Sequence, residues 1–148
     1  MDQPTADAAL RELERLAGEW RLTAVGATGE AWPGESRSSF ERHPSGAYLV
    51  QRTTIDLREA PNSTSIIGCD AANGTYCQLY SDDRGVCRIY AMTIDEREWT
   101  LSREGQPFRQ RFAGRFEAGG RKIVGRWEKA EDGEDYTIDF ELTYTRIQ

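Results

Sequence analysis

The sequence has few of the residues on which metal sites and nucleophilic active sites usually depend. Histidine occurs only as His43, and cysteine only as Cys69, Cys77 and Cys87. An odd number of cysteines without zinc-type spacing argues against a disulfide framework and a structural zinc ion. We expect reduced thiols on half-buried strand positions. There is no Gly-x-Ser-x-Gly motif, and His43 is expected to face outward at a strand end. The sequence therefore predicts no metal and no cofactor, and it leaves catalytic residues unknown.

Long apolar runs and an excess of positive charge are missing as well. No apolar stretch approaches the roughly 20 residues that a membrane-spanning helix needs. The first fifteen residues are polar, without the pattern of a secretion signal. We therefore expect a cytoplasmic protein with no membrane partner. The formal net charge of −6 also argues against a nucleic-acid partner, because general affinity for phosphate backbones comes from Lys and Arg.

A short amphipathic helix is predicted near the N-terminus. Leu10, Leu13 and Leu16 recur at helical spacing, with charged residues on the opposite face. Gly18 is a residue type that commonly ends helices. These signals place a helix at about residues 5–17, and its apolar stripe must cover an apolar surface elsewhere in the fold.

From Gly18 onward the apolar residues recur with the period of two that is typical of half-buried strands. In the clearest segment, Tyr136, Ile138, Phe140, Leu142 and Tyr144 share one predicted face. Turn dipeptides such as those at 73–74 and 119–120 favour tight antiparallel hairpins. About ten strands are predicted, near 19–26, 36–43, 47–56, 64–71, 75–81, 86–93, 98–103, 108–117, 122–129 and 135–146.

The predicted fold is all-β, with a short N-terminal helix. Hairpins this local form an antiparallel meander, and about ten twisted strands remove their free edges by closing into a barrel. No change in composition marks a second domain. We therefore expect residues 1–148 to form one domain, with the barrel at about 18–146.

Two groups of residues resemble lipocalin-like (calycin) barrels. In those barrels the Trp of a Gly-x-Trp motif plugs one end, and an Arg of the last strand packs across it. Gly18-Glu19-Trp20 and Arg146 match that arrangement. The resemblance therefore implies that Trp20 and Arg146 close the barrel structurally.

A bacterial family of lipocalin-like domains of unknown function resembles the chain over most of its length, from about residue 13 to 146. The shared pattern is Gly68-x-Asp70, then Gly74-x-Tyr76, and a final Tyr-x-Arg. It implies a small barrel with a ligand cavity.

The haem-binding branch of the lipocalin-like barrels has a Gly-x-Trp-x-Gly-x-Gly start and a late histidine. Here Trp20 is followed by Arg-Leu-Thr-Ala and no histidine follows His43, so haem is disfavoured.

Polar residues interrupt the alternation on the central strands, around 76–80 and 86–92. A dry core would be destabilised by each unpaired polar group it enclosed, whereas a ligand- or water-bearing lumen gives such groups partners. We predict a cavity lined by Tyr76, Gln78, Arg88, Tyr90, Trp99, Gln110, Phe112, Trp127 and Phe140. The competing interpretation is that the aromatic residues fill the barrel and that Arg88 and Gln78 face outward.

The predicted function is binding of a small, mostly hydrophobic ligand, whose anionic or carbonyl group would meet Arg88 and a tyrosine hydroxyl. Two alternatives stay open. One is a cofactor-independent enzyme, a cyclase or isomerase, that uses the lumen as its active site by holding a reactive substrate in position. The other is an interaction module with a filled barrel, which could form a homodimer through exposed strand faces.

Overall fold

Ten strands, one α-helix and a short 3-10 helix (Ala118–Gly120) make up the computed structural model, which describes residues 6–70, 72–105, 108–131 and 133–147. Among these residues each predicted strand agrees with an observed one to within two residues at either end. The helix is α1 (Ala6–Leu13), and the strands are β1 (Gly18–Gly26), β2 (Ser36–Arg42), β3 (Leu49–Thr54), β4 (Ser63–Asp70), β5 (Thr75–Asp82), β6 (Cys87–Ile94), β7 (Glu98–Arg103), β8 (Phe108–Glu117), β9 (Lys122–Glu131) and β10 (Thr137–Arg146).

The strands form a closed antiparallel meander, as the sequence predicts. Each strand pairs with the next one along the chain, and β1 pairs with β10 to complete the barrel. At this seam Trp20 lies opposite Arg146. Alternate residues of each strand face the interior, so the period of two in the sequence becomes one buried and one solvated surface.

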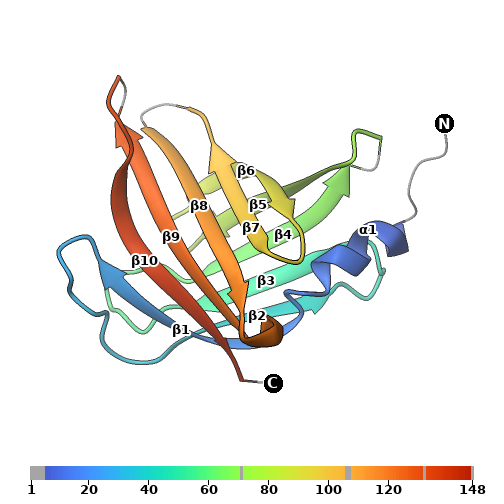
Figure 1. Ribbon diagram of the computed structural model, residues 1–148, viewed down its shortest axis with the longest axis horizontal. Helices are drawn as coiled ribbons and strands as arrows, with labels where there is room; N and C mark the ends of the chain where they lie inside the picture. The colour runs from blue at the N-terminus through green and yellow to red at the C-terminus, as the bar shows by residue number, and fades with distance from the viewer. Residues whose placement is uncertain (1–5, 71, 106–107, 132, 148) are drawn as a thin grey trace.

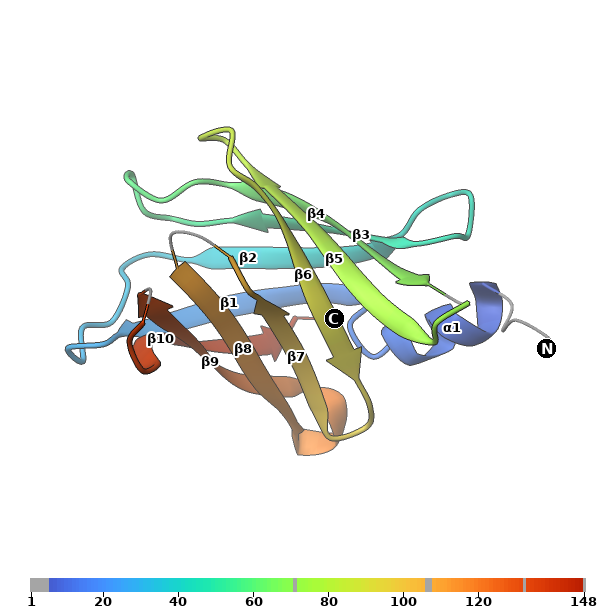
Figure 2. The ribbon, with the colours of Figure 1, turned by 90° about the horizontal axis from the view of Figure 1, so that it is seen from above.

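Helix α1 lies at one end of the barrel, and the loop between β1 and β2 lies at the other end (Figures 1 and 2). Leu10, Leu13 and Leu16 are buried in the main core, and Trp20 Nε1 donates a hydrogen bond to the Leu16 carbonyl at 2.9 Å. The end covered by α1 is therefore closed by side chains.

The helix is shorter than predicted, because it ends at Leu13 rather than near residue 17. The backbone then tightens, and Leu16 N donates to Leu13 O at 2.9 Å. This turn keeps Leu16 buried and brings its carbonyl to Trp20. The predicted start at residue 5 lies outside the described residues.

The predicted uninterrupted alternation of the last strand is wrong at Asp139. The pairing of β10 with β9 shifts register between Ile138 and Phe140, so a bulge adds one residue and reverses the faces before it. Ile138 is consequently 40% exposed. Tyr136 lies outside the barrel, where the guanidinium carbon of Arg111 is 3.8 Å from its ring centre.

The outer face of β4, β5 and β6 carries a row of aliphatic side chains. Ile66 lies opposite Leu79, and Leu79 lies opposite Ile89. All three are exposed, Ile89 most of all at 70%.

Cys77 and Cys87 are exposed on two of these strands, β5 and β6. The prediction of half-buried thiols is therefore wrong for these two cysteines, although all three cysteines are free, as expected.

His43 lies beside the turn between β2 and β3. Its Nδ1 is 2.8 Å from Ser45 Oγ, and its ring stacks on Tyr48 with 4.4 Å between the ring centres.

Among the described residues no helix has the length and apolar character needed to cross a membrane.

Candidate ligand-binding cavity

A cavity of about 420 Å³ occupies the interior of the barrel. Its mouth is at the end opposite α1, where the loops after β1, β3 and β5 contribute Trp32, Pro61 and Arg84 to the lining. Small-molecule sites in proteins commonly enclose roughly 300–1,000 Å³. The cavity therefore has the size of a site for a small organic molecule.

Eight of the nine residues predicted to line a cavity do line it. They are Gln78, Arg88, Tyr90, Trp99, Gln110, Phe112, Trp127 and Phe140. The competing interpretation, in which Arg88 and Gln78 face outward, is wrong. Tyr76 does not line the cavity, because it lies at the α1 end of β5 and packs there against the core.

The inner wall of the cavity is aromatic. Trp99 contacts Phe112 edge-on at 5.1 Å between ring centres and Tyr144 at 5.7 Å. Phe112 in turn lies 5.3 Å from Trp127. Edge-to-face and tilted contacts at these distances are favourable and restrict the rings. The apolar part of the cavity therefore has a preformed shape.

A pair of glycines makes room for Phe112 in this wall. Gly114 of β8 lies opposite Gly125 of β9. A Cβ atom added at Gly125 would lie 2.5 Å from Phe112 Cζ, and one added at Gly114 would lie 2.9 Å from Phe112 Cε2. These distances are too short for nonbonded carbon atoms, so any larger residue would displace the ring.

Polar side chains line the opposite wall, on β2 to β5. Gln51 Nε2 donates to Ser38 Oγ at 3.0 Å. Gln78 Nε2 donates to Ser65 Oγ at 3.2 Å and to Gln51 Oε1 at 3.4 Å. Gln51, Ser65 and Gln78 are all buried, which is unusual for polar residues unless they have partners.

Two buried polar atoms of the cavity lining lack such partners. Among the described residues nothing hydrogen-bonds to Gln78 Oε1 or to Trp99 Nε1. Gln78 is 5% exposed and Trp99 is 1% exposed. An unpaired buried donor or acceptor costs about 1–3 kcal/mol. Gln78 therefore keeps one unpaired acceptor and Trp99 one unpaired donor.

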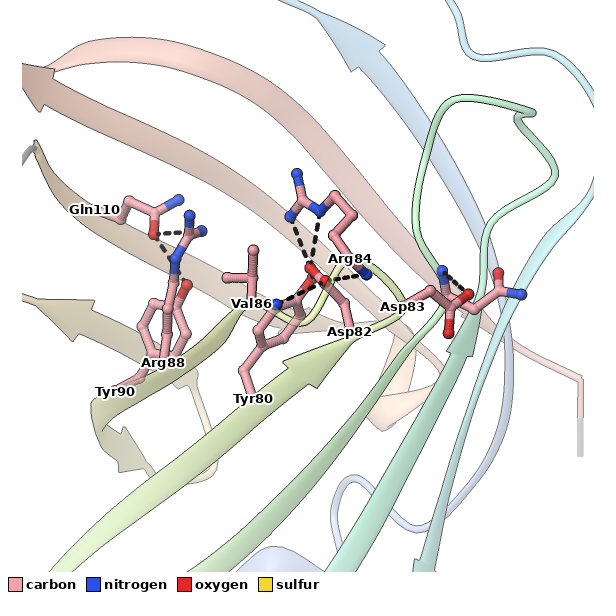
Figure 3. A network of polar contacts seen from close by, with 9 residues as sticks. Tyr80, Asp82, Asp83, Arg84, Val86, Arg88, Tyr90 and Gln110 are labelled. Carbon is pink, nitrogen blue, oxygen red and sulfur yellow. Dashed lines mark hydrogen bonds and ion pairs between the residues drawn. The ribbon is translucent and has the colours of Figure 1, made fainter.

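Arg88 lies inside the cavity next to its mouth. Its Nη1 donates to Gln110 Oε1 at 3.3 Å, and the Tyr90 hydroxyl donates to the same oxygen at 3.0 Å (Figure 3). The guanidinium carbon lies 5.4 Å from the ring centre of Phe108. Arg88 forms no ion pair with any carboxylate of the described residues, in contrast to Arg84, which pairs with Asp82. Arg88 is therefore a half-buried cation that no described carboxylate neutralises, and it is available to a ligand.

Asp82 accepts hydrogen bonds from several neighbours beside Arg88 (Figure 3). Its Oδ2 accepts from the Tyr80 hydroxyl and from Arg84 Nη2, each at 2.7 Å, and its Oδ1 accepts from the Arg84 backbone N–H at 2.9 Å. The carboxyl side chain is 0% exposed. The bond from Arg84 is the largest of the effects that hold the pKa of Asp82 well below its ordinary value. Asp82 therefore stays ionised and fixes Tyr80 and Arg84 at the cavity.

The cavity tyrosines all have raised pKa values. Burial is the main cause for Tyr80, Tyr90 and Tyr144. For Tyr80 the hydrogen bond to Asp82 adds to the effect, whereas Arg88 opposes it for Tyr90. The three hydroxyls are therefore protonated at neutral pH.

Several lining residues are not among those predicted from the sequence, and Tyr80, Arg84 and Asp139 are the most informative of them. Tyr80 and Asp82 follow Gln78 at a spacing of two and share its face. That spacing was a usable signal. Asp139 lines the cavity because of the bulge in β10, which no local sequence pattern predicted.

No protein-family model matches the chain, and neither does any curated protein. Among solved structures, the chain is similar to the crystal structure of Rv2717c from M. tuberculosis, with a TM-score of 0.67. The similarity covers 99% of this chain and 100% of that chain, at 14% sequence identity. At this identity the likeness shows the barrel fold alone.

Proposed function

We propose that the barrel binds a small, mostly apolar molecule whose anionic or carbonyl group meets Arg88. The observation that carries this proposal is the position of Arg88, a half-buried cation that pairs with no carboxylate of the described residues, at the mouth of an aromatic cavity. Guanidinium groups form strong, charge-assisted hydrogen bonds with carboxylates and phosphates. An apolar wall with a few well-placed polar groups is the usual composition of a small-molecule site.

The charge states in the cavity favour binding over acid–base catalysis. A general acid or base works best when its pKa is near the working pH. The pKa values that shift here all move away from neutrality, upward for Tyr80 and Tyr90 and downward for Asp82. These groups therefore serve as fixed donors and a fixed anion. The presence of an interior cavity also favours ligand binding over an interaction module with a filled barrel.

We also propose that the chain is a lipocalin-like barrel and that it works in the cytoplasm. The contact of Arg146 with the ring of Trp20 supports the first proposal, because the resemblance to lipocalin-like barrels implies that contact. The three free cysteines support the second, because reducing compartments preserve thiols.

Three probes of equal chain length test the binding proposal: decanoate, 1-decanol and decyltrimethylammonium. We expect saturable, one-to-one binding that quenches tryptophan fluorescence, with decanoate the tightest. Arg88→Met should weaken decanoate by about 10- to 100-fold, since it removes a charge-assisted interaction, and should change the affinity for 1-decanol by less than about threefold. Arg126→Met is the matched control, because Arg126 lies on the outer face and pairs there with Glu141 at 3.4 Å.

The proposal is overturned if the folded protein shows no saturable binding of any of the three probes. If Arg88→Met weakens all three equally, Arg88 shapes the cavity without recognising an anion, and that part of the proposal is wrong. Chemical analysis of a bound probe recovered after incubation separates binding from turnover.

A further inference from the structure

We propose that the outer face of β4, β5 and β6 binds a second copy of this chain, so that two barrels pack against each other through these strands. The three strands lie side by side (Figure 2), and the row Ile66, Leu79 and Ile89 crosses them. The face is on the outside of the barrel, so this inference is independent of the proposed function.

Large aliphatic side chains and two thiols are exposed together on this face. Ile66 is 43% exposed, Leu79 39% and Ile89 70%. Single exposed apolar residues are common on proteins, whereas larger contiguous apolar patches mark interaction sites. Cysteine is among the residue types most often buried, yet Cys77 and Cys87 are exposed here. A partner on this face would bury all five side chains.

The residues on either side of the aliphatic row are small and uncharged. They are Thr64, Ser81 and Cys87 on one side of the row, and Gly68, Cys77 and Ala91 on the other. Together with the row they form a grid of nine positions without a charged side chain, in a chain that is 30% charged. Depletion of charge distinguishes the centre of a protein interface from the remaining surface. The grid therefore has the composition of an interface centre.

The outer face of β8, β9 and β10 has the opposite composition. Arg111 pairs there with Glu128 at 2.9 Å, and Arg126 pairs with Glu141 at 3.4 Å. Exposed ion pairs of this kind are compatible with full solvation. Charged and uncharged residues are therefore segregated around the barrel, and the grid is the part suited to burial.

Charge favours a second copy as the partner. The formal net charge is −6, so two copies repel each other through their charged surfaces. An uncharged aliphatic surface opposes their approach least, and its best complement is another uncharged aliphatic surface. The chain offers such a surface to its own copy.

The row is also self-complementary under two-fold symmetry. Leu79 lies between Ile66 and Ile89. A two-fold axis along the row places each residue opposite its own copy. A two-fold axis along β5 places Leu79 opposite Leu79 and Ile66 opposite Ile89 of the second copy. Aliphatic side chains meet in both cases, as a symmetric dimer with one self-complementary patch requires.

The size of the uncharged surface sets the expected strength of the dimer. Thr100 and Ser102 extend this surface onto β7. Four strands of about eight residues cover a footprint of roughly 500 Å². Two copies would bury about 1,000 Å² in total, which is the lower limit for a specific interface. We therefore expect a weak dimer with a Kd of about 10–100 µM, so that dilute samples contain monomers.

Sedimentation velocity on the full chain tests the dimer, with a reducing agent present so that no disulfide joins two copies. The concentration series runs from about 2 µM to about 500 µM, which brackets the expected Kd. The average mass should rise toward twice the mass of one chain. Ile89→Glu should raise the Kd by about tenfold or more, because the dimer would bury a carboxylate without a partner.

Ile138→Glu is the matched control. It makes the same chemical change at an isoleucine of β10 that is 40% exposed, and it should change the Kd by less than about threefold. Both substitutions replace exposed side chains, so both barrels should fold, and circular dichroism spectra check this.

The two exposed thiols give a second measurement. Cys77 and Cys87 should react more slowly with N-ethylmaleimide at high protein concentration than at low concentration, because the dimer covers them. Mass spectrometry of the labelled peptides follows each cysteine separately. Ile89→Glu should abolish this protection at the same concentration.

Each contrary result overturns the inference. A wild type that is monomeric at every concentration does so. If that monomer binds phosphatidylcholine vesicles and Ile89→Glu abolishes the binding, a membrane surface covers the face instead. A dimer that Ile89→Glu and Ile138→Glu weaken equally responds to added charge and not to this face. A dimer that leaves both thiols equally reactive uses another surface.

Discussion

The guanidinium carbon of Arg146 lies 4.1 Å from the centre of the Trp20 ring, and the two residues face each other across the seam of the barrel. Arg146 also donates to the carbonyls of Ala17, Arg15 and Gly120. One side chain of the last strand therefore joins the segment after α1, the first strand and the turn between β8 and β9. These contacts hold the closed end together opposite the mouth of the cavity.

Removal of this arginine should destabilise the fold. Arg146→Met leaves three carbonyls without their charged donor and removes the cation from the Trp20 ring, so we expect the free energy of unfolding to fall by about 3 kcal/mol. Urea unfolding followed by tryptophan fluorescence measures it. Arg126→Met removes only the exposed ion pair with Glu141. It should lower the free energy of unfolding by less than about 1 kcal/mol. Equal losses in the two variants would show that Arg146 has no special role in closure.

A methyl group at Gly125 should disturb the wall of the cavity. Gly125→Ala places a carbon against Phe112, and overpacking of this kind costs about 1–3 kcal/mol. The displaced ring would also enter the cavity and weaken probe binding. In the Gly125→Ala, Phe112→Leu double variant, part of the lost stability should return, because the smaller side chain leaves room. A double variant that is simply the sum of two losses would contradict this packing relationship.

The Asp82 cluster should make stability depend on pH in the acid range. Arg84, then Tyr80 and the backbone amides, hold the pKa of Asp82 below the ordinary value of 3.8. The stabilisation is therefore complete above that value and is lost as the pH falls toward the lower pKa of the folded state. Asp82→Asn should lower the free energy of unfolding by about 1–2 kcal/mol near neutral pH.

The decisive measurement for Asp82 is the difference between wild type and variant over a pH series. The gap should be constant from about pH 7 to about pH 5 and should shrink below the ordinary aspartate pKa. A gap of the same size at all pH values would mean that the ionised carboxylate contributes nothing and that the side chain matters only for packing.

Helix α1 should contribute through its apolar stripe. Leu13 is fully buried, and truncation of a buried leucine to alanine costs about 2–5 kcal/mol. Leu13→Ala should therefore lower the melting temperature clearly, whereas Ile89→Ala, at a position 70% exposed, should change stability by less than about 0.5 kcal/mol. A thermal unfolding scan by circular dichroism compares them. If the two variants behave alike, α1 is not part of the cooperative unit.

The strands and their order could be predicted from the sequence because their signals are local. A period of two needs only neighbouring residues, and tight turns need residues such as Gly119 that tolerate positive φ, here 66°. The strand ends, the meander and the all-β class follow from these signals. Closing a meander brings its first and last strands together, and the resemblance to lipocalin-like barrels implied that Trp20 and Arg146 meet at that seam.

The tertiary structure decided which side of the central strands faces inward and where the cavity lies. Both faces of β5 and β6 mix polar and apolar residues, so Gln78 and Arg88 could not be assigned to a face by hydrophobicity, and only the packing of neighbouring strands placed them inside. The bulge that brings Asp139 to the cavity depends on the pairing of two strands and leaves no local pattern. The sequence by itself determined a closed barrel. Which end α1 covers, and which buried atoms remain unpaired, depended on contacts between residues far apart in the chain.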